Sequence, residues 1–294
     1  MSLRCFIYSL LLGCSLVACT QVHLPEYNPE IVIEGWIEED GFPVVIVTTS
    51  VPVSLEYQDL SVLNEHLVRW AKVSISDGEK EVILTGRMDD RYFPPYIYTT
   101  ARMRGEVGKT YTLKVEYGGR TETARTTIPA SVPLEYVKVV EHEDGYGIVA
   151  GLKDNRQTRD YYKFFAMVEG VDSTYVSSFL GLVNDTVLDD DVNEISVNTA
   201  FISNFATIER SVVSYLEDDV VRVRFCTMNE DIYNYWEDFD DVATLSTNPF
   251  FPAFKKIRSN VSSGMGYWAG YGSSYYRISI ADSLAQGRVW PMEK

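Results

Sequence analysis

The sequence predicts a mainly β protein, with an N-terminal immunoglobulin-like β-sandwich followed by a mainly-β C-terminal domain that has one or two short helices. Short segments rich in β-branched and aromatic residues, separated by turn residues, recur from residue 30 to residue 280. The chain has 20 tyrosines among its 294 residues, and tyrosine favours strands. About seven such segments precede residue 130, a density typical of an immunoglobulin-like sandwich.

The first two strands are predicted over residues 30–37 and 43–51, as a hairpin whose loop is residues 38–42. Residues 55–68 fit either a helical turn or a long connection. Further strands are expected at 71–76, 79–85, 96–101, 110–117 and 120–128.

The last two of these strands have the clearest pattern. Tyr111, Leu113, Val115 and Tyr117 alternate with polar residues, as in a strand with one buried face. Gly118-Gly119 supplies the positive φ angles of a tight hairpin turn. Two prolines, at 129 and 133, mark a boundary between a sandwich over 30–130 and a second domain over 131–294.

The second domain is expected to contain one amphipathic helix near 228–245. Thr227 and Glu230 have the spacing of a capping box, and Pro249 lies beyond the end. An apolar stripe at helical spacing follows, made by Ile232, Tyr235, Trp236 and Phe239. Strands are expected at 134–140, 147–152, 161–168, 175–182, 220–226 and 275–280.

The N-terminus has the pattern of a lipoprotein signal peptide over residues 1–18. Arg4 precedes an apolar run, which ends in Leu16-Val17-Ala18-Cys19, a bacterial lipobox. Cys19 is therefore the predicted lipidation site, and the lipid anchor is predicted to hold the protein on a membrane. Cys14 also follows a lipobox-like sequence, but cleavage there would leave a very short apolar core. Residues 19–29 would form the tether.

Composition and charge argue against several classes of function. The net charge of −16 is opposite in sign to that of a nucleic-acid binder. The three histidines are far apart, which disfavours a histidine-built metal site or catalytic triad. The mature chain would keep one free thiol, Cys226, and a lone thiol without a partner histidine is more typical of packing than of catalysis.

No sequence motif identifies a catalytic residue, a cofactor or a metal site. Gly108-Lys109-Thr110 resembles the end of a phosphate loop, but Met103 stands where the first glycine is required. Residues 141–144 are more typical of a solvated loop end than of a zinc site, because neighbouring side chains of a strand point to opposite faces. The acidic segments 189–191 and 217–219 are more typical of solvated turns than of calcium sites, because they lack spaced ligands. A carboxylate pair of the kind used by glycosidases remains possible, although no pair stands out.

The most unusual segment, residues 259–276, interleaves glycine with aromatic residues. Exposed rings at Tyr267, Trp268 and Tyr271 could bind a protein partner or stack on sugars. Alternatively, the segment folds back and buries its own rings. The three rings are the candidate binding residues.

Several fragments together resemble one known family. They are Ile33–Glu38, Gly108–Val115, Thr126–Pro129, Asn248–Phe251 and Ser259–Gly266. Over residues 28–280, the chain resembles the Bacteroidota lipoprotein family called domain of unknown function 4249. The resemblance implies an outer-membrane lipoprotein, often encoded beside a TonB-dependent receptor, with no established catalytic residues.

The leading hypothesis is a non-enzymatic outer-membrane lipoprotein that is an accessory of a TonB-dependent transporter in nutrient uptake. The alternative is a lipoprotein that itself binds a glycan or peptide, and a hydrolase is a third. Surface-exported relatives often carry acidic residues after the lipidated cysteine, whereas Thr20-Gln-Val-His-Leu24 follows here. The expected location is therefore the outer membrane, with the periplasmic and cell-surface faces both open.

Overall fold

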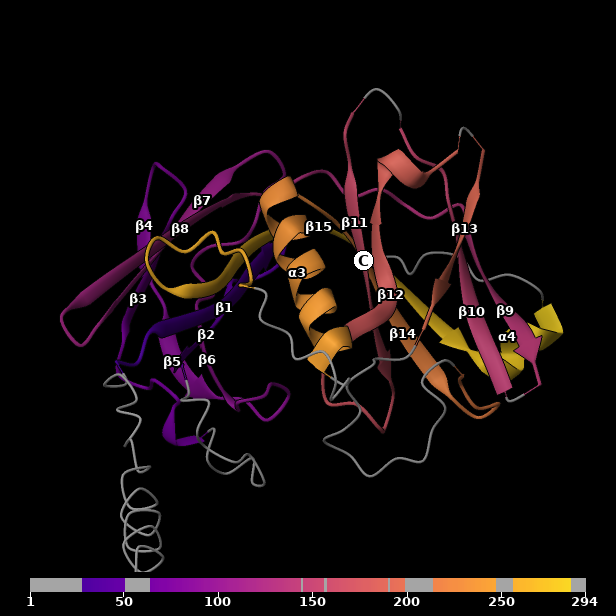
Figure 1. The fold of residues 1–294 in the computed structure, drawn as a ribbon, viewed down its shortest axis with the longest axis horizontal. Helices are drawn as coiled ribbons and strands as arrows, with labels where there is room; N and C mark the ends of the chain where they lie inside the picture. The colour runs from indigo at the N-terminus through magenta and orange to yellow at the C-terminus, as the bar shows by residue number, and fades with distance from the viewer. Residues whose placement is uncertain are drawn as a thin grey trace, which may run out of the picture.

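The computed structural model describes residues 28–50, 64–143, 145–155, 158–189, 191–198, 214–246 and 256–286 (Figure 1). The predicted signal peptide, Cys19, most of the tether and the Asn248–Phe251 fragment lie outside these residues. Within them the chain is mainly β with two helices, as the sequence predicts, and its sheets form a sandwich-like arrangement.

The central layer is one long sheet of eight strands. β15 and β1 run parallel in its middle, and every other neighbouring pair is antiparallel. In spatial order the strands are β12 (Val176–Asn184), β11 (Tyr161–Val168), β14 (Val220–Met228), β15 (Met265–Ser279), β1 (Ile31–Glu38), β2 (Val44–Thr49), β6 (Tyr96–Thr99) and β5 (Thr85–Met88).

Two smaller sheets cover one face of the long sheet and enclose two hydrophobic cores. In the half of the long sheet that contains β1 and β2, Ile33 and Val47 pack with Leu113 and Val115 of one smaller sheet. That sheet is formed by β4 (Glu81–Ile83), β3 (Lys72–Ser76), β7 (Thr110–Tyr117) and β8 (Arg120–Thr127). At the β12 end, Phe164 and Phe225 pack with residues of β13 (Asn193–Val197), β10 (Gly145–Leu152) and β9 (Tyr136–His142).

β15 belongs to both halves of the molecule. Its first seven residues pair with β1, and residues 272–279 pair with β14. Trp268 packs in the first core and Tyr276 in the second. The long sheet therefore crosses the boundary expected near residue 130, and its C-terminal strand completes the N-terminal sandwich.

Most predicted elements are confirmed, but the single strand expected at 79–85 is two short strands in different sheets, β4 and β5, and two further details are wrong. The β7–β8 turn has Gly118 and Gly119 at positive φ, as expected. The final strand, however, begins at Met265 rather than Tyr275. The capping box is also wrong, because Thr227 still belongs to β14 and its buried hydroxyl has no hydrogen-bond partner among the described residues.

Helix α3 (Glu230–Ser246) lies across the other face of the long sheet, which we call the outer face (Figure 1). Its expected stripe is confirmed, since Ile232 and Trp236 are buried against Phe165, Tyr267 and Tyr271. A one-turn 3-10 helix (Asp185–Val187) follows β12, and α4 (Ile280–Gln286) follows β15. Within the described ranges, no helix is long and apolar enough to cross a membrane.

Candidate functional site

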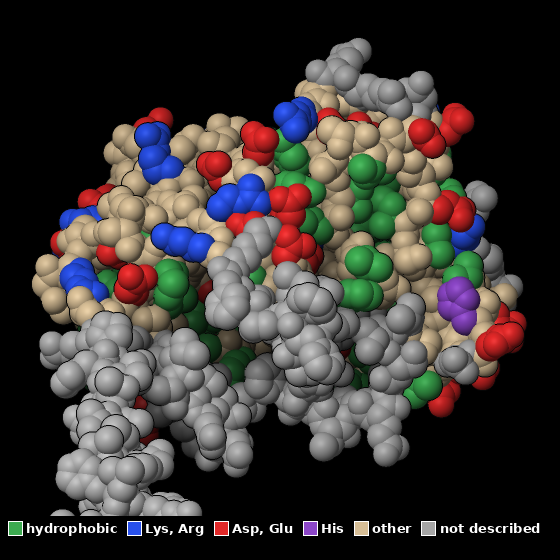
Figure 2. Space-filling model, in the orientation of Figure 1, with side chains coloured by type: hydrophobic (Ala, Val, Ile, Leu, Met, Phe, Trp, Pro, Cys, Tyr) green, Lys and Arg blue, Asp and Glu red, His purple; other side chains and the backbone are tan. Residues whose placement is uncertain are grey.

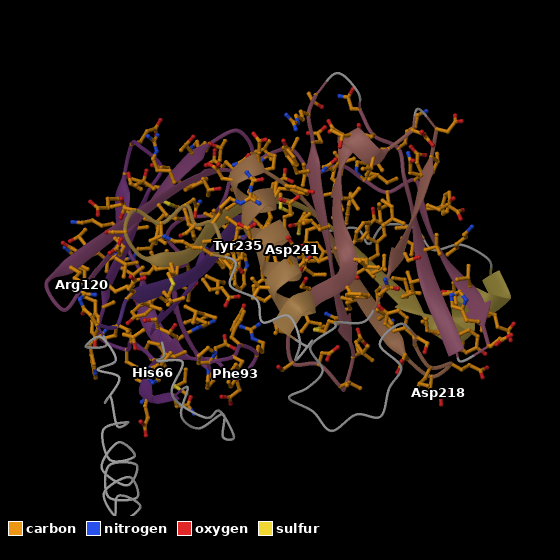
Figure 3. All side chains as sticks on the ribbon, in the orientation of Figure 1. His66, Phe93, Arg120, Asp218, Tyr235 and Asp241 are labelled. Atoms are coloured by element: carbon orange, nitrogen blue, oxygen red, sulfur yellow. The ribbon has the colours of Figure 1, made fainter. Side chains whose placement is uncertain are left out.

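A pocket with a volume of about 810 Å³ lies on the outer face, beside α3. Strands β1, β2, β14 and β15 contribute to it, together with β12 and the connection between β5 and β6. Tyr235 and Asp241 project from α3 in Figure 3, and Phe93, which lines the pocket, lies below them. Aromatic rings supply much of its wall, notably Trp36, Phe165, Tyr175 and Phe239.

Strand β1 places three consecutive outer-face residues in the pocket: Glu34, Trp36 and Glu38. Side chains alternate along a strand, so Ile33 and Ile37 enter the first core. One face of the Ile33–Glu38 fragment thus packs in the first core, and its other face lines the pocket.

A buried ion pair lies at one side of the pocket. Arg224 Nη1 donates to Glu38 Oε1 at 2.6 Å, and both residues are over nine-tenths buried. The guanidinium stacks over the Phe165 ring, with its central carbon 4.2 Å from the ring centroid. Tyr275 also donates to Glu38; burial and the Glu38 charge raise the pKa of Tyr275, so its hydroxyl stays protonated. These contacts fix Arg224 and Glu38 in place.

Glu34 has different surroundings. Its side chain lines the pocket and is exposed to the space inside it. The Tyr267 hydroxyl donates to Glu34 Oε1 at 3.1 Å from the adjacent strand. Loss of solvent raises the pKa of Glu34, and the Tyr267 hydrogen bond only partly offsets this.

Three ion pairs hold α3 beside the pocket. The fully buried Lys163 of β11 donates to Asp240 at 2.7 Å, and burial lowers the pKa of Lys163 and raises that of Asp240. Arg258 bonds both Asp238, at 2.6 Å, and Glu237, at 2.7 Å. Basic and acidic side chains accordingly gather over α3 in Figure 2.

The three candidate binding residues are all buried, at 4%, 0% and 1% exposure for Tyr267, Trp268 and Tyr271. Trp268 lies in the first core and donates to the Tyr111 carbonyl at 3.1 Å. Tyr271 accepts a hydrogen bond from Trp236 Nε1 at 3.0 Å. Their burial agrees with the alternative that the segment buries its own rings, and it leaves none of the three exposed as a contact ring. Tyr267 alone of the three lines the pocket.

The rings are buried because their segment is a central strand rather than a loop. Its glycines allow close crossing by the end of β8: a Cβ at Gly270 would lie 2.6 Å from the Thr127 carbonyl oxygen, and one at Gly272 would lie 2.5 Å from that of Pro129. Tyr267 and Tyr271 point to the outer face and pack under α3.

The remaining candidates show no assembled chemistry. Cys226 is buried, as expected for a packing thiol, and burial raises its pKa to about 12. Asp219 accepts from the Leu216 amide within its own turn, as expected, but it is buried rather than solvated. Asp144 and Asp190 lie outside the described residues. Among the residues that are described, no three His, Cys, Asp or Glu side chains form a group able to hold a metal.

The sequence contains a weak indication of this pocket, which is the presence of charged residues inside central strands. Arg222 and Arg224 interrupt an otherwise apolar strand, and Glu34 and Glu38 do the same in β1. Charged residues inside central strands indicate a second, polar surface on that sheet.

Comparison with known proteins gives one finding. None of the curated proteins matches the chain. The family model described as Domain of unknown function (DUF4249) matches residues 20–277, which include every described residue that lines the pocket. The chain therefore belongs to the DUF4249 family.

Proposed function

We propose that the protein is a non-enzymatic binding protein of the cell envelope, which captures an organic ligand in the pocket beside α3. The pocket itself carries this proposal. Its volume of about 810 Å³ lies within the range of small-molecule sites, about 300–1,000 Å³. Aromatic walls with few converging polar groups are the usual composition of such sites.

The ion pairs favour binding over hydrolysis. Three carboxylates of the pocket are in ion pairs: Glu38 with Arg224, Glu237 with Arg258, and Asp240 with Lys163. Carboxylates held in this way fix the pocket wall, whereas a glycosidase needs two carboxyl groups that both reach the scissile bond. The ligand classes expected from the sequence, a glycan or a peptide, remain the first to examine.

The full chain, purified in mild detergent, tests the proposal by a thermal-shift screen of oligosaccharides, peptides and small amines. For a ligand that raises the melting temperature, Trp36→Ala should weaken binding by about ten-fold or more, because a buried aromatic contact is lost. Trp70→Ala is the matched control, since Trp70 is 89% exposed and lies outside the pocket. Failure of every class to bind, or equal effects of the two variants, would argue against the pocket.

We further propose that Cys19 carries fatty acyl chains such as palmitate, and that the protein is a partner of a TonB-dependent receptor in the outer membrane of a Bacteroidota cell. The lipobox and the resemblance described above support this. Metabolic labelling with a palmitate analogue should fail for Cys19→Ser and persist for Cys14→Ser. The tagged protein should copurify with such a receptor, and repeated recovery alone would count against the partnership.

A further inference from the structure

Glu34 differs from the other pocket carboxylates. Of the five that line the pocket, Glu38, Glu237 and Asp240 are ion-paired as described, and Asp241 has interactions of its own. Among the described residues, no Lys or Arg forms an ion pair with Glu34. Its carboxylate accepts one hydrogen bond there, from Tyr267. Arg224 is the single Lys or Arg among the described lining residues.

Aromatic rings surround this carboxylate. Trp36 is the next outer-face residue of β1, and Tyr267 lies directly opposite Glu34 on β15. Tyr235 and Trp236 of α3 pack on Tyr267, with ring centroids 4.6 and 5.6 Å away. A carboxylate ringed by aromatic groups is a favourable setting for an organic cation, because the ring faces attract positive charge and the carboxylate neutralises it.

We propose that the pocket selects ligands that join an apolar ring or chain to a protonated amine or quaternary ammonium group, with Glu34 as the counter-ion. The inference rests on the proposed function, because it names the class of ligand for the same pocket. The one Lys or Arg of the described pocket lining reinforces the selection, since the charge of Arg224 is already paired with that of Glu38. A ligand carboxylate near Glu34 would meet an unneutralised like charge.

The raised pKa of Glu34 is consistent with this role. Loss of solvent without a neutralising cation disfavours the ionised carboxylate, and groups with shifted pKa values concentrate at functional sites. A bound ammonium group would supply the missing charge.

Three fluorescent probes with one ring system test the inference: dansylcadaverine, which is cationic, dansylamide, which is neutral, and dansylglycine, which is anionic. Titrated into the full chain in mild detergent near neutral pH, the cationic probe should bind about ten-fold tighter than the neutral one, and the anionic probe weakest. Glu34→Gln should remove the preference while retaining binding of dansylamide. Glu30→Gln, which removes the same charge just before β1 and outside the pocket, should leave the preference intact.

Equal or tighter binding of the neutral or anionic probe overturns the inference, as does a preference that survives in Glu34→Gln. If no dansyl probe binds, the cation inference fails; the proposed function fails as well only if the Trp36 screen also finds no ligand. Trp36→Ala should weaken the binding of all three probes, whereas Glu34→Gln should change only the order of their affinities. The proposed function and the cation inference can therefore be tested separately. Circular dichroism of each variant checks that it folds.

Discussion

At the residue scale, Glu34 should lower the stability of the protein at neutral pH. Its pKa in the folded state lies above the ordinary value of 4.5, so the folded state holds the Glu34 proton more tightly than the unfolded state does. The free energy of unfolding should therefore fall as pH rises through 4.5 toward the folded pKa. A carboxylate retained at such a position is better explained by a ligand than by packing.

Glu34→Gln should consequently raise the melting temperature near neutral pH, because the ionised form no longer has to be held in the folded state. The gain should vanish near pH 3, well below 4.5, where the carboxyl group is protonated in both the folded and the unfolded state. Thermal unfolding followed by circular dichroism at the two pH values measures this. A lower melting temperature for the variant near neutral pH would show that Glu34 stabilises the fold.

At the element scale, the Ser259–Gly266 fragment has a structural role that its resemblance to the family does not reveal. Its loop surrounds the buried Glu122 of β8, with Ser262 Oγ at 2.8 Å and the Gly264 amide at 2.9 Å from Glu122 Oε2. Asn260 meanwhile bridges to both backbone groups of Trp268. The fragment thus joins β8 to β15 by hydrogen bonds.

This arrangement has a pH signature. Burial alone would raise the pKa of Glu122, but hydrogen bonds from Ser262, Ser263 and Gly264 outweigh it and lower the pKa. The stabilisation is then complete above 4.5 and is lost as pH falls through the lowered pKa. Glu122→Gln should cost about 2 kcal/mol near neutral pH, because two or more charge-assisted hydrogen bonds weaken.

Urea denaturation measures this loss, which should shrink in acid, near pH 3. Glu116→Gln is the control, since Glu116 pairs with Lys72 and Lys114 on the surface and should matter much less. A loss for Glu122→Gln that does not change with pH would contradict the explanation.

How far the elements could be predicted depends on local pattern. β7 and β8 follow from strict alternation and two glycines at a turn. β15 does not, because Gly266, Gly270 and Gly272 reduce local strand propensity. The fold shows why glycine is needed at such positions: a Cβ at Gly266 would lie 1.8 Å from the Ile33 carbonyl oxygen, which is too close for any side chain.

The pocket was harder to predict than the strands. It is built by residues nearly 200 positions apart, such as Glu38 and Arg224, whose sequence separation is 186. Neither residue has a motif around it, and the sequence does not show that β1 and β14 flank the same strand. The sequence pattern indicates the Tyr267 ring either as an exposed contact or as a buried ring of its own segment, and neither reading places it in a pocket wall.

At the scale of the whole molecule, one continuous sheet serves two sandwich cores. Because β15 pairs with β1 and β14 and places a large ring in each core, loss of its packing should affect both halves together. Calorimetry of the intact chain should accordingly show one unfolding transition rather than two.

Trp268→Ala tests this coupling. The fully buried indole lies in the first core, and its removal should cost roughly 3 to 5 kcal/mol by cavity formation and lost contacts. The single transition should move to lower temperature as a whole, while Trp70→Ala leaves it nearly unchanged. A split into two transitions, with the second unshifted, would mean that the halves unfold independently.

The central claim, that the outer-face pocket binds an organic cation, is tested most directly by a crystal structure of the protein with dansylcadaverine. The proposal predicts density for the ring system beside Trp36 and α3, with the amine within hydrogen-bond distance of Glu34. A probe bound elsewhere, or one in the pocket with its amine directed away from Glu34, would contradict the account.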